Sequence, residues 1–146
     1  MTAIDPAEAL ATDALESLLA AESSVRRRLA ADLEREGLSS SGFSVLMVLS
    51  AHGGELELRA LRAKLNTSKA NATEVVTTLE TRGMVQRFRL AHDRRAASVR
   101  LTTQGRELID RLVPEHTRRV SAAFSVLDES EKRALADICR KLATAA

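Results

Sequence analysis

The first 36 residues place apolar side chains at helical spacing. Between Pro6 and Gly37 there is no glycine and no second proline, and an apolar residue recurs every three or four positions. The stripe consists of Leu10, Ala14, Leu18, Ala21, Val25, Leu29 and Leu33. The pattern predicts one helix of about 30 residues, roughly 45 Å long. A domain of 146 residues is too small to cover such a helix, so we expect the stripe to pack against another chain.

The next segment predicts three shorter helices. Serines at 39–41 offer an N-cap for a helix to about residue 51, and a short extended piece follows at 55–57. A compact helix over 58–65 and another over about 68–82 are separated by a three-residue polar turn. Two helices so joined, with a third before them, form a helix-turn-helix arrangement.

The second helix of this pair is polar on the side opposite its apolar residues. The polar side presents Ser68, Lys69, Asn71, Thr73, Glu74 and Thr77. These groups are small or polar enough to enter a DNA major groove. The same pattern also describes an ordinary solvated helix face, so the helix alone leaves both interpretations open.

A basic hairpin follows directly. Residues 84–90 and 97–101 alternate apolar and polar side chains, which predicts two strands, with a charged tip over 91–96. A basic hairpin after a recognition helix is typical of a wing, which reaches phosphates or an adjacent minor groove.

The chain ends in two predicted helices. Thr102 offers a cap for a helix from Thr103 to about Leu127, and Asp128 with Glu131 forms a capping box for the last helix. The apolar face of that last helix comprises Leu135, Ile138, Cys139 and Leu142. The predicted fold is therefore mainly α, a single domain over 1–146. A winged helix-turn-helix lobe at 37–102 contains a small β-wing, and long helices lie within 1–36 and 103–146.

The formal charge of +2 conceals an uneven distribution. Residues 1–36 carry four arginines and eight acids, a net charge of −4. Residues 82–106 carry seven arginines and one acid, a net charge of +6. Arginine suits phosphate contacts and narrow minor grooves. The distribution favours a polyanion partner for the hairpin, although a solvated charged hairpin without a partner remains the alternative.

Composition excludes several classes of function. With three phenylalanines and no tyrosine or tryptophan, the chain lacks the aromatic platforms that hold single-stranded nucleic acid. The three histidines, His52, His92 and His116, lie in different predicted elements, and no phosphate loop or nucleophile elbow occurs. We therefore expect no enzyme activity and no cofactor.

The lone cysteine and the absence of a long apolar run argue against disulfides, cysteine metal sites and membrane spans. Cys139 alone provides neither an intrachain disulfide nor a multi-cysteine metal site. No apolar run approaches the roughly 20 residues that span a bilayer, and residues 1–6 lack a signal-like segment. We expect a cytoplasmic protein that binds no metal and no membrane.

Three consecutive motifs resemble the MarR family of winged-helix transcription regulators. They are Leu79-Glu80-Thr81-Arg82-Gly83-Met84-Val85-Gln86-Arg87, then Asp93-Arg94-Arg95, then Val99-Arg100-Leu101-Thr102-Thr103-Gln104-Gly105. The family pattern is L-E-x-x-G-L-V-x-R, a short wing, D-x-R and V-x-L-T-x-x-G, and the spacings match without a gap. The resemblance extends through the flanking helices to nearly the whole chain.

The resemblance implies a homodimer joined through the first and last helices, with Leu10, Leu18, Leu135, Ile138 and Leu142 at the interface. Two recognition helices would then meet successive major grooves of a pseudo-palindromic duplex, about 34 to 36 Å apart.

For the wing, the resemblance implies a division of roles. Asp93 would orient Arg95 at the tip, and Arg95 or Arg94 would enter the minor groove. Arg87 and Arg89 occupy positions that the family turns toward phosphates.

Glu74 departs from the family pattern, which often has a basic residue there. A carboxylate repels phosphate but accepts a hydrogen bond from a cytosine amino group. The sequence leaves open whether Glu74 reads a base or points away from DNA.

The resemblance also implies a small aromatic or phenolic acid as effector, bound between the dimer helices and the DNA-binding lobe. Arg26, Arg27, Phe43, Met47 and His116 are the candidate contacts. The alternative is that the arginines form a solvated helix face and that Phe43 and Met47 belong to the core.

The function expected from these features is a DNA-binding transcription regulator, a repressor released by its effector. Two alternatives stay open. One is a redox-responsive regulator acting through Cys139, although a cysteine on an apolar face usually behaves as a small inert hydrophobe. The other is a dimeric adaptor that does not bind DNA.

Overall fold

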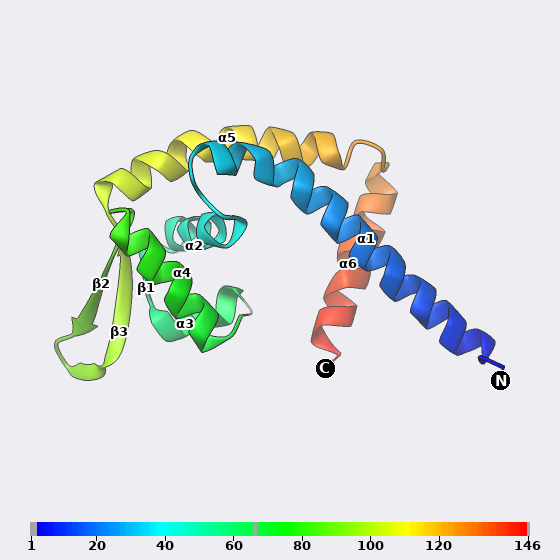
Figure 1. Cartoon of the computed structure of the whole chain (residues 1–146), viewed down its shortest axis with the longest axis horizontal. Coiled ribbons are helices and arrows are strands. Elements are labelled where there is room, and N and C mark those ends of the chain that lie inside the picture. Colours follow the sequence, from blue (N-terminus) through cyan, green and yellow to red (C-terminus); the bar gives the residue numbers. More distant parts are fainter. Residues whose placement is uncertain (1–2, 66, 146) are drawn as a thin grey trace. The chain divides into compact units, whose positions relative to one another are not determined.

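The computed structural model describes residues 3–65 and 67–145, apart from the side chain of Arg94. The elements in chain order are α1 (Pro6–Arg35), α2 (Ser40–Ala51), β1 (Glu55–Glu57), α3 (Leu58–Leu65), α4 (Lys69–Thr81), β2 (Val85–Leu90), β3 (Asp93–Leu101), α5 (Thr103–Ala123) and α6 (Glu129–Thr144). Figure 1 shows the mainly helical chain with its small antiparallel hairpin, which confirms the predicted fold class.

The chain forms two compact units. One comprises residues 30–115, and the other comprises residues 1–29 with 116–146. Their limits fall inside α1 and α5, so each of these helices contributes to both units.

Helix boundaries follow the capping residues. The Ser39 hydroxyl accepts from the Gly42 amide at 3.0 Å, and the Ser68 hydroxyl accepts from the Asn71 amide at 3.1 Å. Each bond satisfies an amide that the first helical turn leaves without a partner. The capping box predicted for Asp128 and Glu131 is present at the start of α6.

One predicted boundary is wrong. Helix α5 ends at Ala123 rather than near Leu127. The Ser125 amide bonds to the Ala122 carbonyl and the Leu127 amide to the Phe124 carbonyl, both three residues back. This tighter turn ends the α-helical ladder and leads into the extended N-cap residue Asp128.

Residues 30–115 enclose the hydrophobic core. Helix α2 contacts both α3 and α4, and each of the three helices contacts at least one strand of the sheet. The fully buried side chains include Val45, Leu46, Leu49, Leu61, Val76, Val99 and Ile109. Helices α1 to α5 and strands β2 and β3 each contribute at least one side chain to a single cluster, and Leu56 of β1 packs against it.

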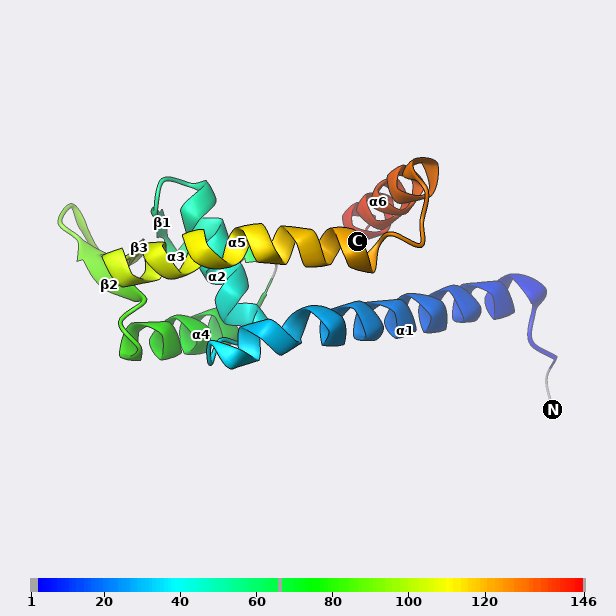
Figure 2. The same ribbon diagram turned by 90° about the horizontal axis from the view of Figure 1, so that it is seen from above.

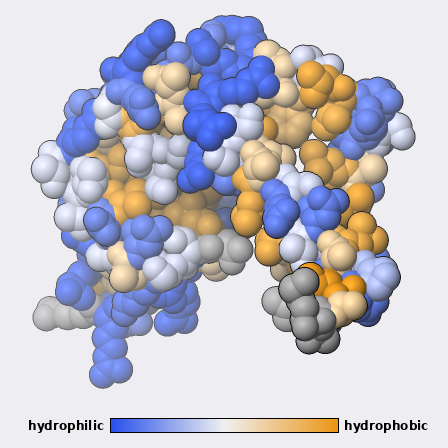
Figure 3. Space-filling view, turned by 45° about the vertical axis from the view of Figure 1, so that its right-hand side comes forward, coloured by the Kyte–Doolittle hydropathy of each residue, from blue (hydrophilic) through white to orange (hydrophobic). Residues whose placement is uncertain are grey.

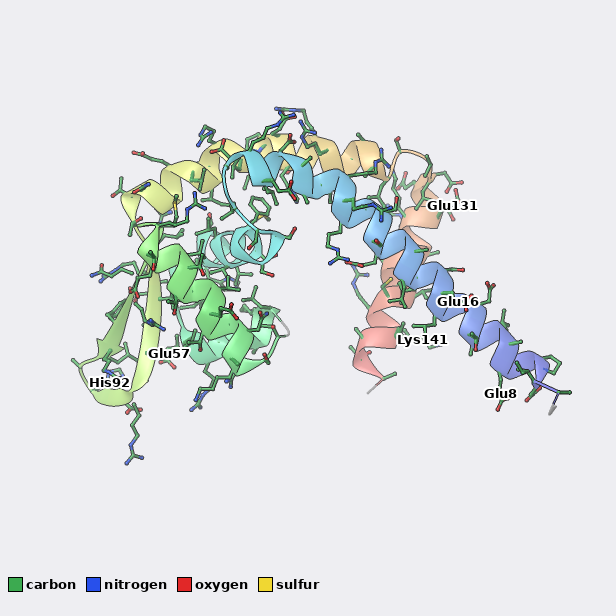
Figure 4. The ribbon with its side chains drawn as sticks, in the orientation of Figure 1. Glu8, Glu16, Glu57, His92, Glu131 and Lys141 are labelled. Atoms are coloured by element: carbon green, nitrogen blue, oxygen red, sulfur yellow. The ribbon has the colours of Figure 1, made fainter. Side chains whose placement is uncertain are left out.

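The sheet has strand order β1-β3-β2, with both pairings antiparallel. The hairpin is longer than predicted, because β3 begins at Asp93 and only Ala91 and His92 form the turn. Figure 4 labels His92 at this turn. The predicted tip over 91–96 is therefore wrong in extent. Asp93 Oδ1 accepts from the Arg95 amide at 3.0 Å, and the register shifts between Arg89 and Leu90. Because of this irregularity, β3 starts at Asp93, whereas the alternation of apolar and polar residues predicts a start at residue 97.

The end of α4 is bonded to the start of α5. Gly83, at φ 76°, donates to Glu80, and the next amide, of Met84, donates to Leu79. This is a glycine-terminated helix end, in which the residue after the C-cap adopts a positive φ. The Thr102 hydroxyl donates to the Gly83 carbonyl at 2.6 Å and accepts from the Gly105 amide at 3.0 Å.

Gly105 permits this close approach. A Cβ atom at this position would collide with the Met84 carbonyl. We expect Gly105→Ala to lower the free energy of unfolding by about 2 to 4 kcal/mol, since the colliding atoms are backbone. Thermal unfolding followed by circular dichroism measures the loss. Gly53→Ala is the control: a Cβ there meets no atom within 4 Å, although its φ of 77° adds local strain. A smaller loss for Gly105→Ala than for Gly53→Ala would contradict the assigned contact.

The second unit exposes large apolar side chains. They include Leu10, Leu15, Leu18 and Leu19 on α1, and Leu135, Ile138 and Leu142 on α6. Figure 2 shows α6 standing apart from the N-terminal part of α1, and Figure 3 shows hydrophobic patches over the terminal helices. Leu10 is 70% exposed and Ile138 is 63% exposed, so this chain alone leaves both apolar faces open to solvent. None of the described helices combines the length and apolar character needed to cross a bilayer.

Candidate nucleic-acid interface

Helix α4 turns one face into the core and the other outward. Ala72, Val76 and Leu79 are buried, and the helix contacts α2 and β2. Of the residues predicted to face DNA, Thr73 is half-buried, whereas the others are exposed: Ser68, Lys69, Asn71, Glu74 and Thr77. The structure thus places the predicted set on the solvent side of one helix.

Several of these polar groups already have partners. The Asn71 side-chain amide donates to the Thr67 hydroxyl at 2.7 Å, in addition to the cap at Ser68. The Thr77 hydroxyl donates to the Thr73 carbonyl at 2.8 Å. These bonds restrain the side chains at the start of α4 and use the Thr77 hydroxyl proton within the helix.

Glu80 joins α4 to the hairpin. Its carboxylate accepts from the Arg87 amide at 2.8 Å and forms an ion pair with the Arg87 guanidinium at 3.4 Å. Arg87, predicted to face phosphate, therefore already has an acidic partner within the chain. The glutamate and arginine of the first quoted motif thus form a contact between α4 and β2.

The far end of the hairpin presents the remaining predicted arginines. Arg89 and Arg95 are exposed, and Asp93 holds the backbone amide of Arg95 rather than its guanidinium. The side chain of Arg94 lies outside the described part of the chain. Figure 3 shows the protruding hairpin as strongly hydrophilic.

Two arginines of the basic segment have structural contacts that sequence reasoning missed. Arg100 lies over the Phe88 ring at 4.5 Å from its centroid and forms an ion pair with Glu55 at 3.8 Å. Arg82 donates to the carbonyls of Glu36 and Gly37, at the end of α1. Charge counting finds these arginines but does not show their partners, because the partners are distant in sequence. Part of the basic charge counted along this segment is therefore paired within the chain.

An ion pair also links α5 to the segment that follows α1. The Arg111 guanidinium donates to both carboxylate oxygens of Glu36, at 2.7 and 3.3 Å. This bond lowers the pKa of the Glu36 carboxyl below its ordinary value and raises the pKa of Arg111. Burial lowers the pKa of His116, which favours its neutral form.

The residues predicted for an effector fall in different units. Arg26 is bound to Glu22 at 3.1 Å and Arg27 to Ser23 at 3.0 Å, both on exposed turns of α1. Phe43 is buried in the core of the lobe, whereas Met47 is exposed. His116 is half-buried and belongs to the unit that contains Arg26 and Arg27.

The described residues include no cluster of three or more histidine, cysteine, aspartate or glutamate side chains able to hold a metal ion. Cys139 is a free thiol and exposed, beside the equally exposed Ile138 and Leu142.

The fold and this exposed helix with its hairpin define a winged helix-turn-helix protein. A MarR family model matches residues 38–97. Among curated relatives, the uncharacterized HTH-type transcriptional regulator YkoM of Bacillus subtilis (strain 168) is 30% identical over 75% of this chain and 71% of its own length. The chain belongs to the MarR family.

Two further relatives are matched over a smaller share of their length. The uncharacterized HTH-type transcriptional regulator YdgJ of Bacillus subtilis (strain 168) is 34% identical over 73% of this chain. The transcriptional repressor MprA of Escherichia coli (strain K12) is 31% identical over 75% of this chain. The alignments cover 64% of YdgJ and 63% of MprA, less than two thirds of either. All three relatives are named as transcriptional regulators, in agreement with the expectation that the chain is not an enzyme.

Solved structures share the fold over nearly the whole chain. Sco3205, a MarR family regulator from Streptomyces coelicolor solved in complex with DNA, aligns with a TM-score of 0.86, 24% identity and coverage of 98% of this chain and 89% of its own. The PcaV regulator from the same organism, solved with its natural ligand, aligns with a TM-score of 0.78 and 25% identity over 99% of both chains.

Proposed function

We propose that this protein is a transcription regulator that binds duplex DNA as a homodimer. The observation that carries the proposal is the pairing of an exposed polar face on α4 with an arginine-bearing hairpin, fixed to it through Glu80 and Thr102. In this arrangement α4 reads base edges in a major groove, and Arg89 and Arg95 reach phosphates or the adjacent minor groove.

The homodimer follows from the open apolar faces. A second copy would cover Leu10, Leu18, Leu135, Ile138 and Leu142. Two recognition helices would then address a pseudo-palindromic site with half-sites one helical turn apart, about 34 to 36 Å. Repression is the expected outcome, in line with the relative MprA, which is named a transcriptional repressor.

Selection of bound duplexes from a random pool, followed by titration of the selected site, tests this function. We expect enrichment of an inverted repeat. Binding should weaken steeply as salt rises, because each neutralised phosphate contributes about 0.9 to the log-log slope. An adaptor that does not bind DNA would enrich no sequence.

We further propose an aromatic or phenolic acid as effector. Support comes from the family membership, from PcaV, which was solved with its natural ligand, and from the arginines Arg26 and Arg27. Phe43 is a core residue of the other unit, whereas His116 belongs to the same unit as the two arginines and is a candidate for a ring contact. Thermal-shift screening with a set of aromatic acids tests it: stabilisation supports an effector, and no stabilisation across the set argues against one.

A further inference from the structure

The outward ridge of α4 is defined by its buried residues. At about 100° per residue along a helix, Ala70, Glu74, Thr77 and Thr81 fall on the side opposite the buried Ala72, Val76 and Leu79. Glu74 lies in the middle of this ridge and is exposed. Glu74 also borders the hollow between α4 and residues 37–42. If α4 enters a major groove, its position on the outward ridge brings the Glu74 carboxylate within reach of the base edges.

The Glu74 carboxylate has no hydrogen bond or ion pair to any of the side chains described in the structure. The helix neighbours four residues away are Ala70 and Thr78, neither of them a cation. Glu80, the other acid of α4, is bonded to Arg87. Arg82 is occupied by the carbonyls at the end of α1.

The other polar groups near the ridge use their donors within the helix. The Thr77 hydroxyl bonds to the Thr73 carbonyl, the Thr78 hydroxyl to the Glu74 carbonyl and the Thr81 hydroxyl to the Thr77 carbonyl. The hydroxyl protons of these threonines are therefore used within the helix, and the strongest acceptor on the ridge is the carboxylate of Glu74.

A carboxylate desolvated against DNA requires a hydrogen-bond donor, because an unpaired buried charge is costly. In the major groove the bases offer two donors, the amino groups of cytosine and adenine. The adenine amino group lies beside the N7 acceptor, which repels a carboxylate, whereas the cytosine amino group has no adjacent acceptor on that edge.

We propose that Glu74 is a specificity-determining residue that selects a C·G base pair in each half-site by accepting a hydrogen bond from cytosine N4. The inference rests on the proposed function, since it assumes that α4 binds DNA. Under this proposal, the acidic residue that replaces the basic residue often found at this position in the family determines which base is preferred.

The test is selection of duplex DNA from a random pool with the wild-type protein, Glu74→Gln and Glu74→Ala. The wild type should enrich cytosine at one position of each half-site. Replacing that pair by T·A should weaken binding by about five- to 150-fold, the range for one good base contact. Glu74→Gln should shift this position to adenine, because glutamine pairs with N6 and N7 of adenine. Glu74→Ala should lose the preference there and keep it elsewhere.

Glu57→Gln is the matched control, since it removes the same charge from an exposed residue of β1 (Figure 4). The control should select the wild-type site. Unchanged preferences in both Glu74 variants would overturn the inference while leaving DNA binding intact, and so would a Glu57→Gln profile identical to that of Glu74→Gln. Failure of the wild type to enrich any DNA would instead overturn the proposed function, and this inference with it. Circular dichroism confirms that each variant is folded.

Discussion

Replacement of Ile138 and Leu142 by glutamate is expected to leave the protein monomeric at micromolar concentration and to abolish tight binding to a two-half-site operator. Both side chains are more than 60% exposed in the single chain, so the substitutions create no cavity in it. In the proposed dimer they would place four carboxylates in an apolar interface, where unpaired charges are costly.

The expected loss of affinity is large because the two half-sites would no longer be bound by one linked protein. Linkage of two binding modules raises overall affinity by about 10² to 10⁴. Sedimentation velocity reports the oligomeric state, and a gel-shift titration reports the affinity. Ser130→Glu is the control, since it adds a carboxylate to the polar side of the same helix. A double variant that remains dimeric would contradict the assigned interface.

Replacement of Arg94 and Arg95 by alanine should weaken binding to all DNA sequences without changing which site is preferred. Phosphate and minor-groove contacts from a wing supply affinity and position rather than base selection. Two arginines per subunit amount to four per dimer, so the log-log salt slope should fall by up to about 3.6 at 0.9 per phosphate.

A titration of the selected duplex at several salt concentrations measures that slope. The double variant Arg133→Ala and Arg140→Ala removes the same charge from α6, where the two side chains pair with Glu129 and Asp137. It should leave the slope near that of the wild type. Normal affinity and an unchanged slope in the wing variant would show that the hairpin does not contact DNA.

Local patterns were enough to predict the elements of the fold. The caps at Ser39, Ser68 and Asp128 lie within three residues of the amides they bind, so the sequence contains both partners of each bond. The length of α1 followed from the absence of glycine and proline. The predicted boundaries were wrong at the end of α5 and at the hairpin turn, where no glycine or proline marks the end of the element.

Contacts between distant segments were not predictable in the same way. Arg82 and Glu36 are 46 residues apart, and Arg111 and Glu36 are 75 apart. Their meeting depends on the packing of the core, which no local pattern encodes. The same limit applies to the arginines of the basic segment. Sequence located them, but only the structure shows that Arg82, Arg87 and Arg100 are paired with groups elsewhere in the chain.

The most direct test of the central claim is the salt dependence of binding between the wild-type dimer and its selected duplex. If two wings and two recognition helices contact the DNA backbone, the logarithm of the binding constant should fall against the logarithm of the salt concentration with a slope of about −5 or steeper. This is the slope for six or more neutralised phosphates. The same arrangement also predicts a protected site with half-sites one helical turn apart. A slope near zero, or the absence of any selected duplex, would contradict DNA binding by this protein.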